Sequence, residues 1–313
     1  MINSPNNTHK SSILAGIEDN FGDKCPKLQA DASIEKHLNI VKAIFSLAFN
    51  EDAIQTNPAQ RVTVTKRNIG IERIPWDQAD IAKLFSCDIF QGALSPKGTF
   101  HLTANSDFWM PIIAILSGMR CEEIGQMIPD DIQRIDDISV FNVSEIDNAG
   151  RTIKRIKTRN SRRIVPIHPI LIEIGLLSYV DAINAAGHCR LFPDLKPFTA
   201  KNGSIKFTKY YSGRHFPNLR QRLELTDPRK PFHAFRHTIK AAWKRAGVPL
   251  VIQHELLGHA TEGGAAAAYA REERTSLSVR AEVIRSTVIP GLPHIPKPTS
   301  YGVVALPRDQ FPV

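Results

Sequence analysis

Histidine, arginine and tyrosine side chains suited to phosphate chemistry lie in the last third of the chain. His233 and Arg236 are three positions apart, so on a helix they share one face. The segment Leu256-Leu257-Gly258-His259 predicts a helix that stops at its glycine and presents His259 from a loop edge. Tyr269 comes ten residues later, after Gly263-Gly264, a pair of weak helix formers that suits a nucleophile that must move. An arginine fork matches two phosphate oxygens, and a phenol can serve as a nucleophile.

Three upstream segments extend this pattern. The sequence SGMRCEEI at residues 117–124 offers Arg120 with an acidic residue, Glu123, three positions further on. Lys157 begins the basic stretch KTRNSRRIVPI, and LFPD follows at residues 191–194. Together with the HAFRH, LLGHA and tyrosine elements, and in this order over roughly residues 75–288, these motifs resemble those of the tyrosine recombinases of the phage-integrase type.

The resemblance implies a DNA breaking-rejoining enzyme. Tyr269 would attack phosphorus and hold one DNA end as a 3′-phosphotyrosine, which keeps the bond energy for rejoining, so no ATP or other cofactor is expected. Arg120 and Arg236 would clamp the phosphate, and Glu123 would orient Arg120. Lys157 would give a proton to the 5′-oxygen leaving group. The two histidines would hydrogen-bond the phosphate or assist proton transfer, which completes the implied catalytic set: Arg120, Lys157, His233, Arg236, His259 and Tyr269.

Positive charge is concentrated near these motifs. The chain has 40 Lys and Arg against 31 Asp and Glu, a net charge of +9, which permits binding to a polyanion. The segment from Arg151 to Arg163 holds seven basic residues and no acid, and a second basic zone runs from Lys196 to Arg245. We therefore expect duplex DNA as the partner, bound mainly through its phosphates. The predicted DNA-binding residues are Arg155, Arg159, Arg162 and Arg163; Arg155 and Arg159 also compete with Lys157 for its role.

A metal site is disfavoured. His233 and His237 are four apart and could bind a metal from one helix face. His254 and His259, however, are five apart and Gly258 breaks the helix between them, unlike a zinc-protease motif. The four cysteines are scattered without CxxC spacing. We expect neither a metal nor a cofactor.

Hydrophobic periodicity predicts a mainly α-helical chain with a small antiparallel three-stranded β-sheet, the fold class of tyrosine-recombinase catalytic domains. Helices are expected near residues 34–49, 77–90, 106–118, 169–186, 233–246, 249–257 and 275–288, and another begins at residue 121. The three strands are expected near residues 138–143, 153–156 and 164–167, separated by the turns DNAG and TRNS.

The domain organisation expected from the resemblance is incomplete. Residues 1–33 are predicted to be an irregular lead-in, 34–75 the remnant of a helical DNA-clamping domain with its linker, 76–288 the catalytic domain, and 289–313 an extended tail with six prolines. A full-length member has a clamp of about a hundred residues, so the chain is either shortened or has an atypical clamp in residues 1–33. No apolar run is long enough for a membrane helix and no signal segment opens the chain, so we expect a cytoplasmic protein without membrane contact.

Several alternatives remain open at the level of sequence. The last amphipathic helix could pack on its own domain or dock onto a neighbouring protomer in a DNA-bound tetramer. A topoisomerase-like enzyme that relaxes supercoils shares the same reaction class. The rival from another class is a non-catalytic integrase-like DNA-binding protein that acts as a regulator or excision accessory.

Overall fold

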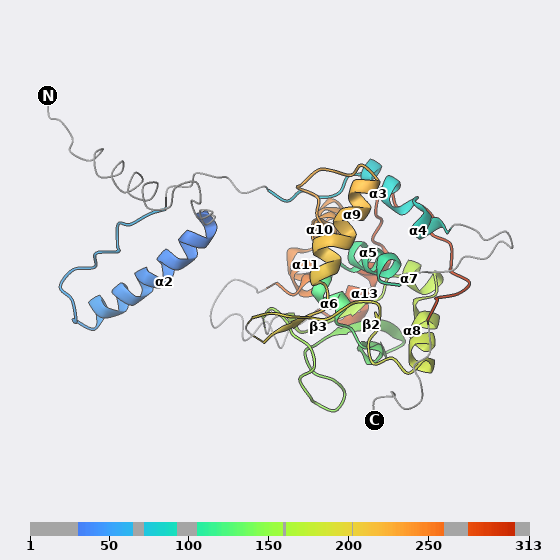
Figure 1. The fold of residues 1–313 in the computed structure, drawn as a ribbon, viewed down its shortest axis with the longest axis horizontal. Coiled ribbons are helices and arrows are strands. Elements are labelled where there is room, and N and C mark those ends of the chain that lie inside the picture. Colours follow the sequence, from blue (N-terminus) through green and yellow to red (C-terminus); the bar gives the residue numbers. More distant parts are fainter. Residues whose placement is uncertain are drawn as a thin grey trace. The chain divides into compact units, whose positions relative to one another are not determined.

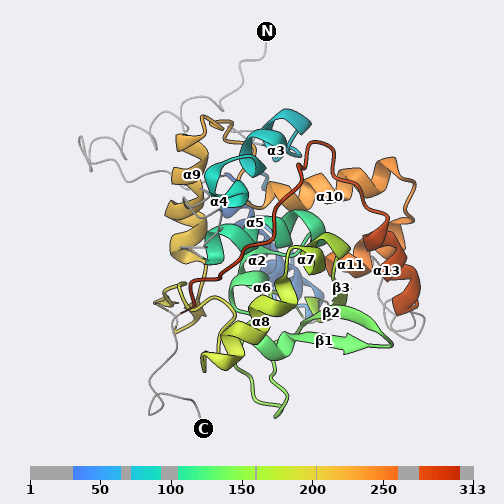
Figure 2. The same ribbon diagram turned by 90° about the vertical axis from the view of Figure 1, so that its right-hand side faces the viewer.

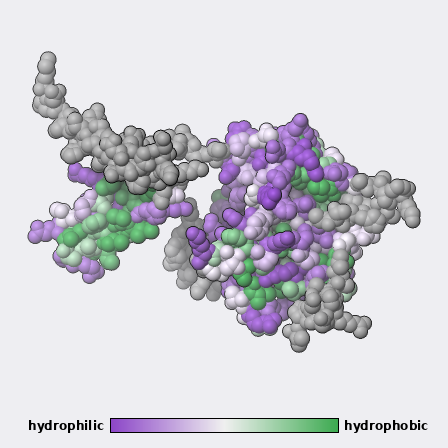
Figure 3. Space-filling view, viewed as in Figure 1, coloured by the Kyte–Doolittle hydropathy of each residue, from purple (hydrophilic) through white to green (hydrophobic). Residues whose placement is uncertain are grey.

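The computed structural model describes residues 31–64, 72–92, 105–158, 161–201, 203–259 and 275–303. The chain divides into two compact units, Met1–Glu72 and Arg73–Val313. In the first unit, helix α2 (Asp31–Asn50) covers the helix predicted at residues 34–49. Its apolar residues Ile40, Ile44 and Leu47 are exposed in the described part of the chain, and Figure 3 shows apolar side chains gathered along this helix. Its assignment to a DNA clamp stays a prediction.

The second unit is mainly helical, as predicted. Its α-helices are α3 (Gln78–Phe85), α4 (Asp88–Gln91), α5 (Asn105–Ser117), α6 (Cys121–Gly125), α7 (Pro169–Glu173), α8 (Leu176–Ala185), α9 (Phe216–Arg222), α10 (Ala234–Arg245), α11 (Leu250–Leu257) and α13 (Leu277–Arg285). A 3₁₀ turn, η2 (Pro129–Asp131), and a π-helical turn, η4 (Tyr211–His215), complete the helical elements of the described residues. None of the described helices is both long and apolar enough to span a membrane.

Helix α5 lies at the centre of the core. Its residues Phe108 to Leu116 are apolar on every side and fully or almost fully buried, which is the pattern of a helix enclosed by neighbours. Figure 1 shows α5 in the middle of the second unit, next to α10. The central helix ends at Ser117, and the chain turns directly into α6, so the segment that carries Arg120 starts from a rigid support.

The three-stranded antiparallel sheet is present, but one of its strands differs from the prediction. Strands β1 (Ile132–Ile135), β2 (Ile138–Val143) and β3 (Arg163–Pro166) lie in the order β1-β2-β3, with Phe141 opposite both Ile132 and Val165. The strand predicted at residues 153–156 was wrong, because these residues form no strand and the only pairing nearby in the described chain is an isolated bridge from Ile146 to Thr152, just before them. A short hairpin, β4 (Phe198–Thr199) and β5 (Ile205–Lys206), was not predicted.

Polar contacts hold residues 153–155 in a loop instead of a strand. The side chain of Gln126 accepts a hydrogen bond from the Arg155 backbone N–H at 2.9 Å and donates one to its carbonyl at 2.8 Å. Lys154 is buried in an ion pair with Asp131. Arg190 donates to the Ile153 carbonyl. The Ile153 and Lys154 N–H groups both donate to the Glu145 backbone carbonyl, so the backbone groups of this segment are used by side chains and by one loop carbonyl instead of by a neighbouring strand.

The proline-rich segment after α13 packs on the second unit. Residues 287–303 have no helix or strand, as expected of a tail, but they cross the surface of the unit as a strap, drawn in red in Figure 2. Ile289 and Ile295 are buried, and the Tyr301 hydroxyl donates to the Gly175 carbonyl at 3.0 Å. Gly291 lies so close to α3 that an added Cβ would be 2.2 Å from the Gln78 carbonyl oxygen. The compact unit thus extends past residue 288.

Helix α13 packs on its own unit, against β3. Ala281 and Ile284 are buried, and Arg280 donates to the Ile164 carbonyl at 2.9 Å. Of the two arrangements compatible with the sequence, the structure has the intramolecular one. Docking of this helix onto a second protomer stays a prediction.

Candidate active site

A tight junction between α5 and α6 positions Arg120. Gly118 has a left-handed backbone with φ of 69°, and an added Cβ would lie 2.7 Å from the Leu257 side chain, so only glycine lets the junction approach α11 this closely. Arg120 then takes the N-cap position of α6, and its backbone N–H donates to Glu123 at 2.8 Å. This local capping brings the Arg120 and Glu123 side chains to the same end of the helix.

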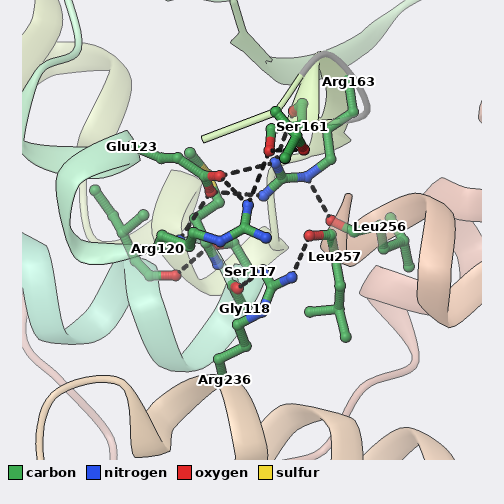
Figure 4. A network of polar contacts seen from close by, with 12 residues as sticks. Ser117, Gly118, Arg120, Glu123, Ser161, Arg163, Arg236, Leu256 and Leu257 are labelled. Atoms are coloured by element: carbon green, nitrogen blue, oxygen red, sulfur yellow. Dashed lines mark hydrogen bonds and ion pairs between the residues drawn. The ribbon is translucent and has the colours of Figure 1, made fainter. Parts of the chain in front are cut away.

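Glu123 is a buried carboxylate that binds two arginines. It accepts hydrogen bonds from Arg120 Nη1 at 2.5 Å and from Arg163 Nη1 and Nη2 at 3.2 and 2.8 Å, as Figure 4 shows. Burial alone would raise the pKa of Glu123, but the charge and hydrogen bonds of Arg163, with those of Arg120, lower it to about 2. The residue is therefore ionised at neutral pH, and its expected role of orienting Arg120 stays a prediction.

Arg163 lies inside the protein, not on its surface. Its side chain is 2% exposed, and besides binding Glu123 it donates from Nε to the Leu256 carbonyl at 2.7 Å and from Nη1 to the Ser161 carbonyl at 2.9 Å. The prediction that Arg163 contacts DNA does not fit this position, because its guanidinium is already bound on all three nitrogens. Its burial follows from its strand: in β3, Arg163 and Val165 share the buried face.

Arg236 comes from α10 and reaches the same place. It donates from Nη1 to the Gly118 carbonyl at 2.7 Å and from Nη2 to the Leu257 carbonyl, and only 5% of the residue is exposed. Burial first, and then the charges of Arg163 and Arg120, lower its pKa to about 9, so it remains a cation at neutral pH. Three guanidinium groups therefore gather around one carboxylate, which we call the arginine cluster (Arg120, Arg163, Arg236 and Glu123).

Two histidines border the arginine cluster. His233 lies at the N-cap of α10, and His259 follows Gly258, whose φ of 63° ends α11 as the sequence predicts. Partial burial and then the charge of Arg236 lower the pKa of each imidazole to about 4, with Arg120 contributing to both. Both rings are therefore neutral at pH 7 and can accept a proton as well as donate a hydrogen bond.

Comparisons with known proteins identify the fold that carries this site. No protein-family profile matches the chain, and no curated protein sequence does. Among solved structures, the Tn1549 transposon integrase in complex with a circular intermediate DNA is 17% identical, with a TM-score of 0.52 over 84% of each chain. The same integrase in complex with transposon right end DNA is 18% identical, with a TM-score of 0.50 over 84% of this chain and 83% of that one. This chain has the tyrosine-recombinase catalytic fold. The fold predicted from the motifs is confirmed.

Within the recombinase fold, the other predicted residues differ in their surroundings. Lys157 is exposed and close enough to His233 to contribute to its lowered pKa. Arg155 is exposed, and only its backbone is bound, by Gln126. Arg162 is exposed but donates from Nε to Glu145 at 2.7 Å, so a phosphate would have to compete with a carboxylate for it. Arg159 and the predicted nucleophile Tyr269 lie outside the described residues.

The recombinase fold also uses residues that the sequence interpretation did not single out. Ser161 accepts a hydrogen bond from Arg120 Nη1 at 3.3 Å. The Glu122 carboxylate accepts from the backbone N–H groups of Phe207 and Thr208, at 2.7 and 3.1 Å, and so holds the start of η4 against α6. The buried position of Arg163 could have been read from strand alternation with Val165; nothing in the local sequence indicates the other contacts.

Among the described residues, no three His, Cys, Asp or Glu side chains gather where they could hold a metal ion. The pair His233 and His237, whose spacing was compatible with a metal, has ring centroids 5.6 Å apart in a perpendicular arrangement. His254 and His259 are arranged similarly, at 5.5 Å. In the part of the site that is described, the positive charges available to bind an anion are those of the arginines and of Lys157.

Proposed function

We propose that this chain is a site-specific tyrosine recombinase, an integrase that cleaves and rejoins duplex DNA through a 3′-phosphotyrosyl intermediate on Tyr269. The observation that carries the proposal is the arginine cluster: Arg120 and Arg236, far apart in the sequence, meet beside two neutral histidines. The similarity in fold to structures of a transposon integrase in complex with DNA supports the same activity.

The charge of the arginine cluster suits a phosphodiester. Three guanidiniums and one carboxylate carry a net charge of two positive units, largely removed from water. Arg120 is the most exposed of these arginines, at 21% of its side chain, and its Nε and Nη2 have no hydrogen-bond partner among the described residues. These groups are free to bind the non-bridging phosphate oxygens. Because preorganised donors need no rearrangement, they stabilise the added negative charge of the transition state.

The proposed reaction is a transesterification. The Tyr269 phenol oxygen bonds to phosphorus, and the bond from phosphorus to the 5′-oxygen breaks. A neutral imidazole, His233 or His259, accepts the phenol proton, and Lys157 gives a proton to the 5′-oxygen. Rejoining reverses these steps with a different DNA end. All transferred protons and electrons are accounted for by these side chains and the DNA.

The position of Tyr269 in the sequence supports its role. His259 borders the arginine cluster, and Thr275, six residues after the tyrosine, has its backbone N–H bound by Glu255 of α11 at 3.1 Å. Six residues span at most about 20 Å. The described residues that flank this segment in the sequence, His259 and Thr275, therefore both lie on or next to α11, the helix whose last carbonyls bind the arginines. We propose that Tyr269 serves the site of its own chain.

The proposal is tested with nicked duplex oligonucleotides from the DNA flanking the gene, in which the nick traps a cleaved strand. A covalent protein–DNA adduct on a denaturing gel is expected, and Tyr269→Phe should abolish it. Tyr210→Phe, which alters an exposed tyrosine at the start of η4, is the matched control and should form the adduct normally. Salt-dependent DNA binding without any adduct would instead favour a non-catalytic regulator. Relaxation of supercoils without synapsis of two duplexes would favour the topoisomerase-like alternative.

A further inference from the structure

Among the three arginines of the arginine cluster, Arg163 is the one that has no role in the proposed reaction. It starts β3, and its side chain is too deeply buried to reach a bound DNA. All three of its nitrogens are nevertheless engaged: Nη1 and Nη2 bind the two oxygens of Glu123, Nε binds the Leu256 carbonyl, and Nη1 also binds the Ser161 carbonyl. A side chain that connects this many segments of one site has a role beyond filling space.

The contacts of Arg163 reach the segments that carry two of the proposed catalytic groups. Arg163 binds Glu123, and Glu123 in turn accepts hydrogen bonds from the backbone and the guanidinium of Arg120. Through Leu256 it holds the last turn of α11, three residues before His259. Gly258 packs directly on it, since an added Cβ would lie 3.0 Å from Arg163 Nη1.

We propose that Arg163 is a positioning residue for strand cleavage that fixes the orientation of Arg120 through Glu123 and the place of His259 through Leu256; this rests on the proposed function. Arg120 contacts both carboxylate oxygens of Glu123, one from its backbone N–H and one from Nη1, so these contacts alone give the Arg120 side chain no restraint from outside its own helix end. Two parallel donors from a planar fork fix the carboxylate plane. The plane of the Glu123 carboxylate in turn sets the direction of Arg120 Nε and Nη2, the two guanidinium nitrogens without a partner among the described residues.

Arg163 and Arg236 act on adjacent parts of the same helix end. Leu256 and Leu257 offer consecutive carbonyls at the C-terminus of α11, one to each arginine. Carbonyls at this end of a helix have no partner within the helix and carry its partial negative charge, so cations bind there favourably. A lysine cannot replace Arg163, because one ammonium on a flexible stem cannot span a carboxylate and two carbonyls in fixed directions.

The first test is Arg163→Lys, which keeps the charge and removes the planar fork. At saturating DNA the rate of adduct formation should fall about 10- to 100-fold, as for other partners that orient a reactive group. The dissociation constant for DNA should stay within about threefold, because the residue does not touch DNA. Arg220→Lys is the matched control: this half-buried arginine binds the Asp227 carbonyl and lies over the Trp76 ring, without contact to Glu123. The Arg220→Lys variant should form the covalent adduct at the wild-type rate.

A double-mutant cycle with Glu123→Gln tests whether Arg163 acts through Glu123. If it does, Arg163→Lys adds little to the loss already caused by Glu123→Gln, because both remove the same restraint on Arg120. Rate losses that multiply would overturn the proposal, as would a wild-type rate for Arg163→Lys alone. Should Arg163→Lys not fold, Arg163→Gln, which is neutral and smaller, takes its place in the same cycle.

One readout does not need activity. Without the Arg163 fork, the pKa of Glu123 in the folded protein rises toward its unfolded value, so the part of the thermal stability that is lost between about pH 4.5 and pH 2 becomes smaller than in the wild type. Arg220→Lys should leave this profile unchanged. If the wild type forms no adduct, the proposed function fails while the acid profile still tests the link between Arg163 and Glu123. If the adduct forms and neither its rate nor the acid profile responds to Arg163→Lys, only the positioning role fails.

Discussion

Replacing Glu123 with glutamine probes the arginine cluster with little change of shape. The carboxylate accepts four hydrogen bonds, two from Arg120 and two from Arg163. An amide offers one acceptor oxygen, and its NH₂ group would face the donors of an arginine. Glu123→Gln thus leaves three guanidiniums close together with no carboxylate between them. We expect a large loss of stability.

The lowered pKa of Glu123 gives the size of the expected loss in the free energy of unfolding. A shift from 4.5 to about 2 corresponds to about 3 kcal/mol in favour of the ionised, folded state, at about 1.4 kcal/mol for each pKa unit. Removing one partner of a buried ion pair costs about 3–5 kcal/mol. Both arguments indicate that the free energy of unfolding falls by about 3–4 kcal/mol. For a unit of this size the melting temperature should drop by about 10 °C.

The loss should depend on pH in a definite direction. Because the folded pKa of Glu123 lies below the unfolded one, its contribution is complete above about 4.5 and disappears as the pH falls through about 2. The difference between wild type and Glu123→Gln should therefore be full at pH 7, smaller at pH 4 and smallest near pH 3. Denaturant unfolding followed by circular dichroism at these pH values measures it.

A surface ion pair supplies the control. Glu224 binds Lys83 at 3.2 Å with 84% of its side chain exposed, so Glu224→Gln should cost less than about 1 kcal/mol. If Glu123→Gln is no more destabilising than Glu224→Gln, or if its effect is the same at pH 7 and pH 3, the reasoning from buried charge is refuted.

Two further predictions concern the histidines and the strap. His259 has a pKa of about 4 in the folded protein, below its unfolded value of 6.5. The unfolded chain therefore binds more protons between these values, so the free energy of unfolding falls as the pH drops from 6.5 to 4. His259→Gln should reduce this pH dependence of the free energy, as measured by urea unfolding. Gly291→Ala, with φ of 85° and the Gln78 oxygen 2.2 Å from the new Cβ, should destabilise the protein by about 2–3 kcal/mol. Gly203→Ala, with φ of 76° in open space, should cost only about 1 kcal/mol; equal losses would contradict the role of strap packing.

Local signals in the sequence were sufficient for most helices and for the positions of the arginine and histidine motifs at helix ends. The three-residue spacing of His233 and Arg236, the glycine stop before His259 and the capping partners Arg120 and Glu123 each depend on neighbours a few positions away. The strand expected at residues 153–156 failed because it rested on Ile153 and Ile156, which are three positions apart and do not alternate as in a strand. Contacts from Gln126 and Arg190, which are distant in the sequence, took up the backbone groups of that segment.

The sequence by itself determined the fold class and the side chains capable of phosphate chemistry, because helical spacing, capping and residue type are local properties. Only the tertiary structure decided that Lys154 of the 151–163 stretch is buried against Asp131 and that Arg163 is held by a carbonyl 93 positions away. It also decided that residues 287–303 form a strap on the core. Burial depends on what covers a surface, and that partner is chosen by the packing of the whole unit and not by neighbours in the chain.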